Sequence, residues 1–357
     1  MYDTRPPIRF FMGSNTPDGF FGFTEDIYRA ADGWRAWLIK GGPGTGKSTL
    51  MRRIGRRWEQ EGKSPEYLHC SSDPTSLDGV ICRADRLCVL DATAPHVIEP
   101  RYWSAVESIL PLDRCVSAAQ LAANREEVVR ITDACKAEHR RCCRYLGAAA
   151  SLLEDGRRLA QTGVNAEKVR RSADRLAARE LGRGSGGREW RRFLDAITPD
   201  GYKQLTETLG ALCPRIVSLE DDTGAVAPLF LETVRERAQA AGYEMFSCYC
   251  PLAPTRLMHL LIPEAGLALT TSNARHKADY PVYRRIHAAR FLDAETVKAH
   301  RPRQSFHRRA VRELLAEATA ASAAAKQLHD ALEALYLPAV DWTAVDALVR
   351  ETGLPFA

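Results

Sequence analysis

One stretch near the N-terminus constrains this chain more than any other. An apolar run at residues 36–39 leads into Gly-x-x-x-x-Gly-Lys-Ser at residues 41–48, and a helical pattern follows from Thr49. This order of strand, glycine-rich loop and helix is the context that a P-loop nucleotide site requires. The glycines let backbone N–H groups surround a phosphate, and the N-terminus of a helix favours the same negative charge. The alternative, a glycine-rich turn with an accidental Lys-Ser, does not account for the flanking strand and helix.

The motif assigns chemical roles within the loop. Lys47 is expected to reach the β- and γ-phosphates, and the Ser48 hydroxyl to ligate Mg²⁺. No Asn-Lys-x-Asp guanine motif follows the loop, which favours ATP over GTP. The residues predicted to contact the nucleotide are Gly41, Gly42, Pro43, Gly44, Thr45, Gly46, Lys47, Ser48 and Thr49.

A second Mg²⁺ group is predicted at the end of another strand. Residues 87–91 are four apolar residues followed by Asp91, the arrangement of a Walker B aspartate that holds Mg²⁺ directly or through water. The alternative is a strand-end aspartate that caps Thr93. The residue after Asp91 is Ala92, where many P-loop ATPases have a glutamate that polarises water. Nucleotide binding is therefore predicted more firmly than fast hydrolysis.

The chain contains an internal duplication. Residues 70–77 (Cys-Ser-Ser-Asp-Pro-Thr-Ser-Leu) recur as residues 250–257 (Cys-Pro-Leu-Ala-Pro-Thr-Arg-Leu), 180 positions later. A Thr-Pro-Asp-Gly turn at residues 16–19 recurs at 198–201. The loop positions of the second copy read Asp-Asp-Thr-Gly-Ala-Val-Ala-Pro (residues 221–228), without the lysine and serine and with two carboxylates that repel phosphate. We expect one working phosphate site, and shared features such as the turn to serve the fold.

Three further residues are candidates for the chemistry. Asp73 and Asp78 follow the second predicted strand, and the second copy replaces both carboxylates. Asp73 in particular is predicted to be catalytic together with Lys47 and Asp91, and turn capping is the alternative for both aspartates. His96 recurs in the second copy, which favours a structural role, with sensing of the γ-phosphate as the alternative.

Arginines offer two other possibilities. Arg256 or Arg275 of the second copy is a candidate arginine finger if the two halves face each other, and a solvated arginine is the alternative. Two arginine clusters permit nucleic-acid contacts, but the first reads as a solvated helix face, and aromatic interleaving is sparse. The clusters are Arg52, Arg53, Arg56 and Arg57, and Arg183, Arg188, Arg191 and Arg192.

Composition bounds the remaining classes. Ten cysteines without an apolar N-terminal signal region predict free thiols in the cytoplasm, and no apolar stretch is long enough for a membrane span. Cys248 and Cys250, with Cys70 and His69, form no Cys-x-x-Cys pair, so we expect buried strand thiols and no metal besides Mg²⁺. Phe20, with its neighbouring phenylalanines, is expected to pack in the core, with stacking on a nucleotide base as the alternative.

The predicted fold class is α/β: duplicated P-loop NTPase-like, three-layer α/β/α domains with mostly parallel sheets and helical appendages. The first domain spans residues 1–186, with a helical insertion at 117–181 that Gly156, Gly163 and Asn165 break, giving an αα-hairpin. The degenerate domain spans residues 187–357, with a helical segment at 304–336. Residues 74–82 read as a short helix or loop, and the Gly/Ser-rich residues 182–187 as a linker.

The chain also resembles a family of uncharacterised bacterial P-loop ATPase-like proteins with two tandem nucleotide-binding halves. Residues 38–51, 69–79 and 90–96 carry the resemblance, which covers most of the chain. The resemblance implies ATP binding but no particular substrate. In relatives the second half can also carry a Gly-Lys-Ser loop, which this chain lacks, so a two-site mechanism is not implied here.

Together these features predict a Mg²⁺-dependent ATP-binding protein that hydrolyses ATP slowly and couples nucleotide state to a conformational change. The helical segments would contact an unknown protein or small-molecule partner, and nucleic acid is permitted but not favoured. Two alternatives stay open. A small-molecule or nucleotide kinase would use residues 140–192 as an arginine-rich lid, and a nucleotide-gated binding module would bind ATP without turnover.

Overall fold

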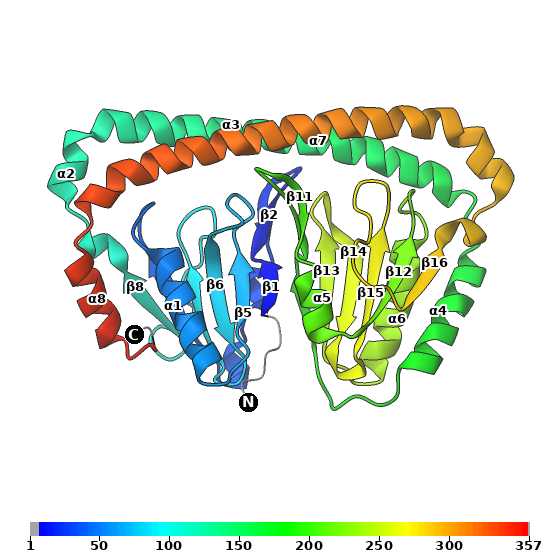
Figure 1. Cartoon of the computed structure of the whole chain (residues 1–357), viewed down its shortest axis with the longest axis horizontal. Coiled ribbons are helices and arrows are strands. Elements are labelled where there is room, and N and C mark those ends of the chain that lie inside the picture. Colours follow the sequence, from blue (N-terminus) through cyan, green and yellow to red (C-terminus); the bar gives the residue numbers. More distant parts are fainter. Residues whose placement is uncertain (1–6, 356–357) are drawn as a thin grey trace.

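The computed structural model describes residues 7–355 and consists of two halves with the same order of strands (Figure 1). The N-terminal segment on which the absence of a signal region was predicted lies largely outside the described residues. The first half comprises β1 (Ile8–Phe11), β2 (Gly13–Thr16), β3 (Gly19–Gly22), η1 (Thr24–Asp26), η2 (Ala30–Asp32), β4 (Arg35–Lys40), α1 (Lys47–Gln60), β5 (Glu66–His69), β6 (Leu77–Cys82), β7 (Leu87–Asp91), β8 (Glu107–Pro111), η3 (Leu112–Cys115), α2 (Ala118–Ala123), α3 (Arg125–Gln161) and α4 (Ala166–Glu180). The second half comprises β9 (Glu189–Arg192), β10 (Asp195–Thr198), β11 (Gly201–Gln204), α5 (Glu207–Leu212), β12 (Arg215–Glu220), α6 (Ala227–Ala240), β13 (Met245–Cys250), β14 (Ala253–Ile262), η4 (Pro263–Ala265), β15 (Leu267–Ser272), β16 (Arg284–His287), η5 (Ala288–Phe291), α7 (Ala294–Tyr336), η6 (Leu337–Ala339) and α8 (Trp342–Glu351).

Each half contains a six-stranded, mostly parallel sheet. The strand orders are β1-β5-β6-β7-β4-β8 and β9-β13-β14-β15-β12-β16, so equivalent strands occupy equivalent places. Only β6 and β14 run antiparallel to both of their neighbours among the described strands. The expected pair of mixed α/β halves is confirmed at this level.

The Thr-Pro-Asp-Gly turn has the same structure in both halves. It closes the β2–β3 and β10–β11 hairpins, and its threonine hydroxyl donates to a glycine carbonyl at 2.7 Å in the first turn and 2.8 Å in the second. Gly19 and Gly201 take φ values of +114° and +100°, which glycine adopts without strain. The turn therefore forms part of the fold in both halves, as its recurrence predicted.

Residues 74–82 were predicted wrongly as a helix or loop, because residues 77–82 form β6. All six residues of β6 are buried, so the strand lacks the alternation of apolar and polar residues that identifies a half-buried strand. Asp78 and Gly79 also interrupt its apolar run. Gly79 packs so closely that a Cβ atom there would lie 2.8 Å from Leu90 of the neighbouring strand.

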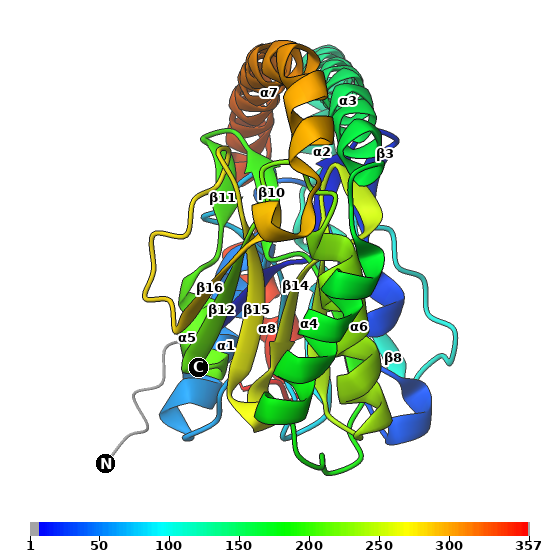
Figure 2. The same cartoon turned by 90° about the vertical axis from the view of Figure 1, so that its right-hand side faces the viewer.

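Two long helices, α3 and α7, lie side by side across both halves and form what we call the helical bridge (Figures 1 and 2). The helix α3 passes through Gly156, where a break was predicted, and ends at Gln161. Asn165 then caps α4 by accepting a hydrogen bond from Lys168 N at 2.9 Å. Gly156 is buried against α7, and a Cβ atom there would lie 3.0 Å from Gln304 Oε1. The antiparallel partner of α3 is thus α7 from the other half, rather than a neighbour in sequence.

The helices that follow α3 and α7 cross to the opposite half. The helix α4 packs on α6, and its Val169 and Leu176 belong to the core of the second sheet. The helix α8 returns to the first half, where Val345 and Val349 join the core of α1. The expected boundary after residue 186 lies between α4 and β9, but each sheet is covered partly by a helix from the other side of that boundary.

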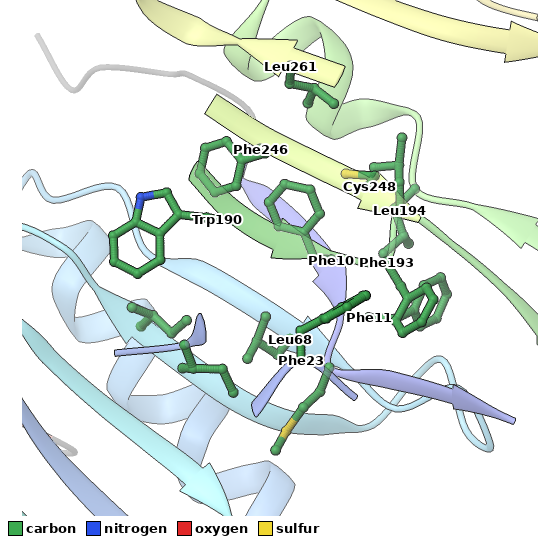
Figure 3. Packing of buried hydrophobic residues seen from close by; sticks show 14 of the residues in the cluster. Phe10, Phe11, Phe23, Leu68, Trp190, Phe193, Leu194, Phe246, Cys248 and Leu261 are labelled. Atoms are coloured by element: carbon green, nitrogen blue, oxygen red, sulfur yellow. The ribbon is translucent and has the colours of Figure 1, made fainter. Parts of the chain in front are cut away.

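A shared core joins the inner edges of the two sheets (Figure 3). Phe10 of β1 stacks on Phe246 of β13 with ring centroids 5.1 Å apart, and Phe11 N donates to Phe193 O at 2.9 Å. Arg192, only 2% exposed, donates to Glu66 at 2.5 Å within this core. The two halves therefore form one continuous body.

Two compositional expectations have structural counterparts. The Gly/Ser-rich residues 182–187, predicted as a linker, connect α4 to β9 and pack against the turn after α6. There Gly184 N donates to Ala241 O, and Gly186 N donates to Gly242 O. All ten cysteines are free. Within residues 7–355, no helix combines the length and the apolar character needed to cross a membrane.

Candidate functional site

The glycine-rich loop (residues 41–48) joins β4 to α1 at the carboxyl end of the first sheet. Gly44 and Gly46 have φ values of +69° and +85°, and Gly46 caps α1. These left-handed conformations favour glycine, and the N-terminus of α1 that follows them favours negative charge. The Lys47 ammonium donates to Gly41 O at 2.7 Å and to Gly42 O at 2.8 Å. Phosphate binding therefore requires this ammonium to exchange loop carbonyls for phosphate oxygens.

Asp91 lies next to Lys47. Strands β4 and β7 are parallel neighbours with Ile39 opposite Asp91, so their carboxyl ends meet at this point. The Asp91 Oδ2 atom is 3.7 Å from Lys47 Nζ. Asp91 Oδ1 accepts a hydrogen bond from Thr93 N at 2.8 Å, which is the capping contact considered as the alternative. One carboxylate oxygen thus holds the turn while the other faces the loop lysine.

Ser48 and Asp91 provide oxygen atoms of the kind that Mg²⁺ binds. Ser48 Oγ accepts hydrogen bonds from Leu77 N at 3.0 Å and, with a longer contact, from Arg52 Nη2 at 3.3 Å. A shift of the Arg52 side chain would leave one Ser48 lone pair available. With Asp91 Oδ2 already directed toward Lys47, this donor set fits a Mg²⁺ ion held next to a phosphate.

Asp73 also lines the cavity in front of the loop, but its carboxylate has local partners. Its Oδ1 accepts hydrogen bonds from Thr75 N at 3.0 Å and Thr75 Oγ1 at 2.6 Å. Its Oδ2 is 3.4 Å from Lys326 Nζ of α7. Burial acts to raise the pKa of Asp73, but the Thr75 bonds and the Lys326 charge outweigh it and lower the pKa. The carboxylate of Asp73, which was predicted to be catalytic, is therefore engaged in capping the turn and in a contact with α7.

Asp78 and His96 meet at the inner wall of the same cavity. Asp78 Oδ2 lies 3.2 Å from His96 Nε2, and both side chains are buried. Burial raises the pKa of Asp78 to about 6, partly opposed by the neighbouring His96. The Phe20 ring packs edge-on against His96 with centroids 4.5 Å apart, whereas Phe23 lies in the shared core. Phe20 therefore contributes to the cavity wall, as well as to packing.

A cavity of about 1270 Å³ separates the loop from the helical bridge. Residues 43–49 form its floor together with Asp73, Asp78 and Asp91, whereas Gly41 and Gly42 do not line it. The opposite wall carries cationic and imidazole side chains that the sequence analysis did not single out as a group. They are Lys136, His139, Arg140 and Arg144 of α3, and Lys326 and His329 of α7. The spacing of four between residues 136, 140 and 144 places them on one helical face, and that was the available signal.

The C-terminal part of the chain contacts the glycine-rich loop. A Cβ atom on Gly42 would lie 2.5 Å from the Tyr336 ring, and one on Gly46 would lie 2.9 Å from the Trp342 ring. Tyr336 ends α7 and Trp342 begins α8. The glycines therefore permit close approach of the bridge, in addition to their backbone conformations.

The equivalent loop of the second half holds its own carboxylate. Asp221 is 3% exposed, and its Oδ1 accepts hydrogen bonds from Thr223 N at 3.1 Å, Thr223 Oγ1 at 2.7 Å and Gly224 N at 2.9 Å. Its Oδ2 accepts from Val226 N and Ala227 N, both at 2.8 Å. The side chain of Asp221 thus occupies the ring of donors where the first loop has only glycine at the equivalent Gly41. These donors of the second loop are therefore already bonded to the chain's own carboxylate.

The two candidate arginine fingers lie away from the cavity. Arg256 donates to Cys250 Sγ at 3.5 Å and is 3.9 Å from Glu154, and neither Arg256 nor Arg275 lines the cavity. The halves sit side by side (Figure 1), and Arg256 lies near Glu154 of α3 instead of the first loop.

The arginines after the glycine-rich segment pair with carboxylates of the first half. Arg188 binds Asp32, and Arg191 binds Asp26. Arg192 binds the buried Glu66, which also accepts a hydrogen bond from Arg83 at 2.7 Å. These contacts hold the two halves together and leave this cluster poorly placed to contact a nucleic-acid backbone.

Comparisons of the chain with protein-family models, with curated proteins and with solved structures find no match. The functional proposal therefore depends on the residues and geometry of the site.

Proposed function

We propose that this chain is a P-loop nucleoside-triphosphatase-like protein that binds Mg²⁺-ATP at residues 41–49. The observation that carries the proposal is the combination of a left-handed Gly44 and Gly46 at the N-terminus of α1 with Lys47 next to Asp91 in one cavity. Lys47 would contact the β- and γ-phosphates, and Ser48 with Asp91 would hold Mg²⁺. When bound, Mg²⁺ would neutralise phosphate charge, and the chain's own groups would orient the triphosphate.

The preferred activity is slow ATP hydrolysis coupled to a conformational change. The coupling is supported by the bridge, because α3 and α7 line the nucleotide cavity at one end and pack over the second half at the other (Figure 1). A triphosphate that attracts Lys136, Arg140 or Lys326 would draw these helices toward the loop. Slow turnover is supported by Ala92, which brings no water-activating carboxylate next to Asp91.

A small-molecule kinase is the second candidate, favoured by the size of the cavity. Its volume of about 1270 Å³ exceeds the range of about 300–1,000 Å³ that is common for single-ligand pockets. The cationic wall of α3 would then hold an anionic acceptor opposite the ATP phosphates.

The first test is ATP affinity by isothermal titration calorimetry with Mg²⁺ present. Lys47→Ala should weaken binding about 10- to 150-fold, because a charge-assisted hydrogen bond contributes about 1.5–3 kcal/mol. Lys63→Ala is the matched control, since Lys63 pairs with Asp85 at 2.6 Å beyond the far end of α1. Unchanged affinity in Lys47→Ala would refute the proposed site.

Phosphate release then separates the activities. Release of phosphate from ATP without an acceptor supports the hydrolase, and ADP formation only when metabolites are added supports the kinase. Tight ATP binding without turnover over hours supports a nucleotide-gated binding module.

A further inference from the structure

Three side chains with metal-ligating atoms meet at the inner wall of the cavity. Cys70 follows β5, Asp78 lies on β6, and His96 lies in the turn after β7. One ligand atom from each, a thiol sulfur, a carboxylate oxygen and an imidazole nitrogen, lies within 4.8 Å of the other two. All three residues line the cavity, and Asp78 and His96 are only 5% and 7% exposed.

The contact between Asp78 and His96 lacks hydrogen-bond geometry. Asp78 Oδ2 is 3.2 Å from His96 Nε2, but this oxygen has no hydrogen-bond partner among the described residues. A buried polar atom without a partner costs about 1–3 kcal/mol, so such an atom indicates a missing ligand. In a tetrahedral site with metal–ligand bonds of about 2.0–2.1 Å, two ligand atoms stand about 3.3 Å apart. The oxygen and the nitrogen already have that spacing.

The second half retains this scaffold without the carboxylate. Cys250 and His276 occupy the equivalent positions, but Met258 replaces Asp78. There the imidazole contacts the Asn273 amide, with 2.7 Å between Nε2 and Nδ2. The chain therefore contains an internal control in which the same cysteine and histidine lack the third ligand.

We infer that Cys70, Asp78 and His96 bind one divalent transition-metal ion of the zinc class. The mixed sulfur, nitrogen and oxygen donors suit Zn²⁺, whereas Mg²⁺ takes oxygen ligands, so this site is separate from the one at Ser48 and Asp91. Three protein ligands leave a fourth position that faces the cavity, where water or an oxygen of a bound ligand can coordinate. The inference goes beyond the proposed function and does not depend on ATP binding.

Cobalt titration of the full-length, reduced, nucleotide-free protein tests the site. Zn²⁺ has a filled d shell and gives no d–d spectrum, so Co²⁺ serves as the probe. We expect one equivalent of Co²⁺ per chain to produce a thiolate-to-cobalt absorption band that Zn²⁺ abolishes and excess Mg²⁺ leaves unchanged. Cys70→Ser should remove the band, and Asp78→Asn should weaken Co²⁺ binding by more than about tenfold, since even outer-shell changes cost about 10- to 100-fold.

Two control variants keep the result specific. Cys250→Ser changes the equivalent cysteine of the second half and should retain the full band. Lys47→Ala should also retain the band although ATP binding is weakened, so failure of the metal site and failure of the nucleotide site can be distinguished. The inference is overturned if the wild-type protein gives no thiolate band at one equivalent, or if folded Cys70→Ser keeps the band. The wild-type titration decides the matter even where a variant does not fold.

Discussion

Replacing Asp221 with alanine tests whether this carboxylate substitutes for a phosphate in the second loop. The side chain accepts five hydrogen bonds, four of them from backbone N–H groups. Two of these donors, Val226 N and Ala227 N, are buried, and a buried donor without a partner costs about 1–3 kcal/mol. Water entering the vacated space restores part of the loss. We therefore expect Asp221→Ala to lower the free energy of unfolding by about 2–4 kcal/mol.

The assay is urea unfolding followed by circular dichroism, with and without added phosphate. The vacated ring of N–H donors should now accept an inorganic anion, so phosphate should restore part of the stability of Asp221→Ala. The comparison is made in a Lys47→Ala background, because the first loop is itself expected to bind phosphate. Asp222→Ala is the control: Asp222 is exposed and accepts one hydrogen bond, from Ala274 N at 2.9 Å. Equal stability of the two variants, or no response of Asp221→Ala to phosphate, would refute the reasoning.

Two further predictions concern how the halves are joined. Arg192→Met should cost about 3–5 kcal/mol by removing the buried partner of Glu66, whereas Arg191→Met, where the arginine is 46% exposed, should cost less in the same urea assay. Although burial acts to raise the Glu66 pKa, Arg192 and Arg83 lower it overall. This pair therefore stabilises the fold above the ordinary glutamate pKa of about 4.3, and its contribution should be lost as the pH falls further. Equal acid sensitivity of Arg192→Met and the wild type would contradict this explanation. Val349→Ala in α8 should increase amide exchange in α1, and Val169→Ala in α4 should increase it in α6. If hydrogen-exchange mass spectrometry instead shows that Val349→Ala affects α6 and Val169→Ala affects α1, the crossing of α4 and α8 to the opposite halves is contradicted.

Local patterns predicted the first phosphate-loop candidate because its requirements are local. A strand, the glycines and lysine of the loop and a helix start lie within 14 residues of sequence from Arg35 to Ser48, and the glycine that the motif requires at position 46 is left-handed. Asp91 was predicted as a partner of the loop because it ends an apolar strand. The parallel pairing of β4 and β7 brings it to the edge of the sheet where the loop lies. The duplication was visible for the same reason, since recurring turns and strands use recurring residues.

Other features were missed because they depend on contacts between distant segments. Asp78 interrupts the apolar run of β6, so the pattern did not indicate a buried strand. The contact between Asp78 and His96 depends on the order of the strands in the sheet. Arg140 and Arg144 on α3 belong to the segment 140–192 that was considered as an arginine-rich lid, whereas Lys136 lies outside it. Only the path of α3 places all three over the loop. The arginine-finger hypothesis required the two halves to face each other. The halves instead associate side by side, and Arg256 lies near Glu154.

The contrast between the first loop and its second copy is a property of the sequence, because it depends on neighbouring residues. Charge and backbone freedom at residues 41–48 and 221–228 distinguish the two loops without reference to the rest of the chain. The tertiary structure decided which groups surround the first loop. Long-range packing brings α7 and α8 onto its glycines. In the second loop, by contrast, the Asp221 carboxylate that was expected to repel phosphate binds N–H groups only two to six residues further along the chain.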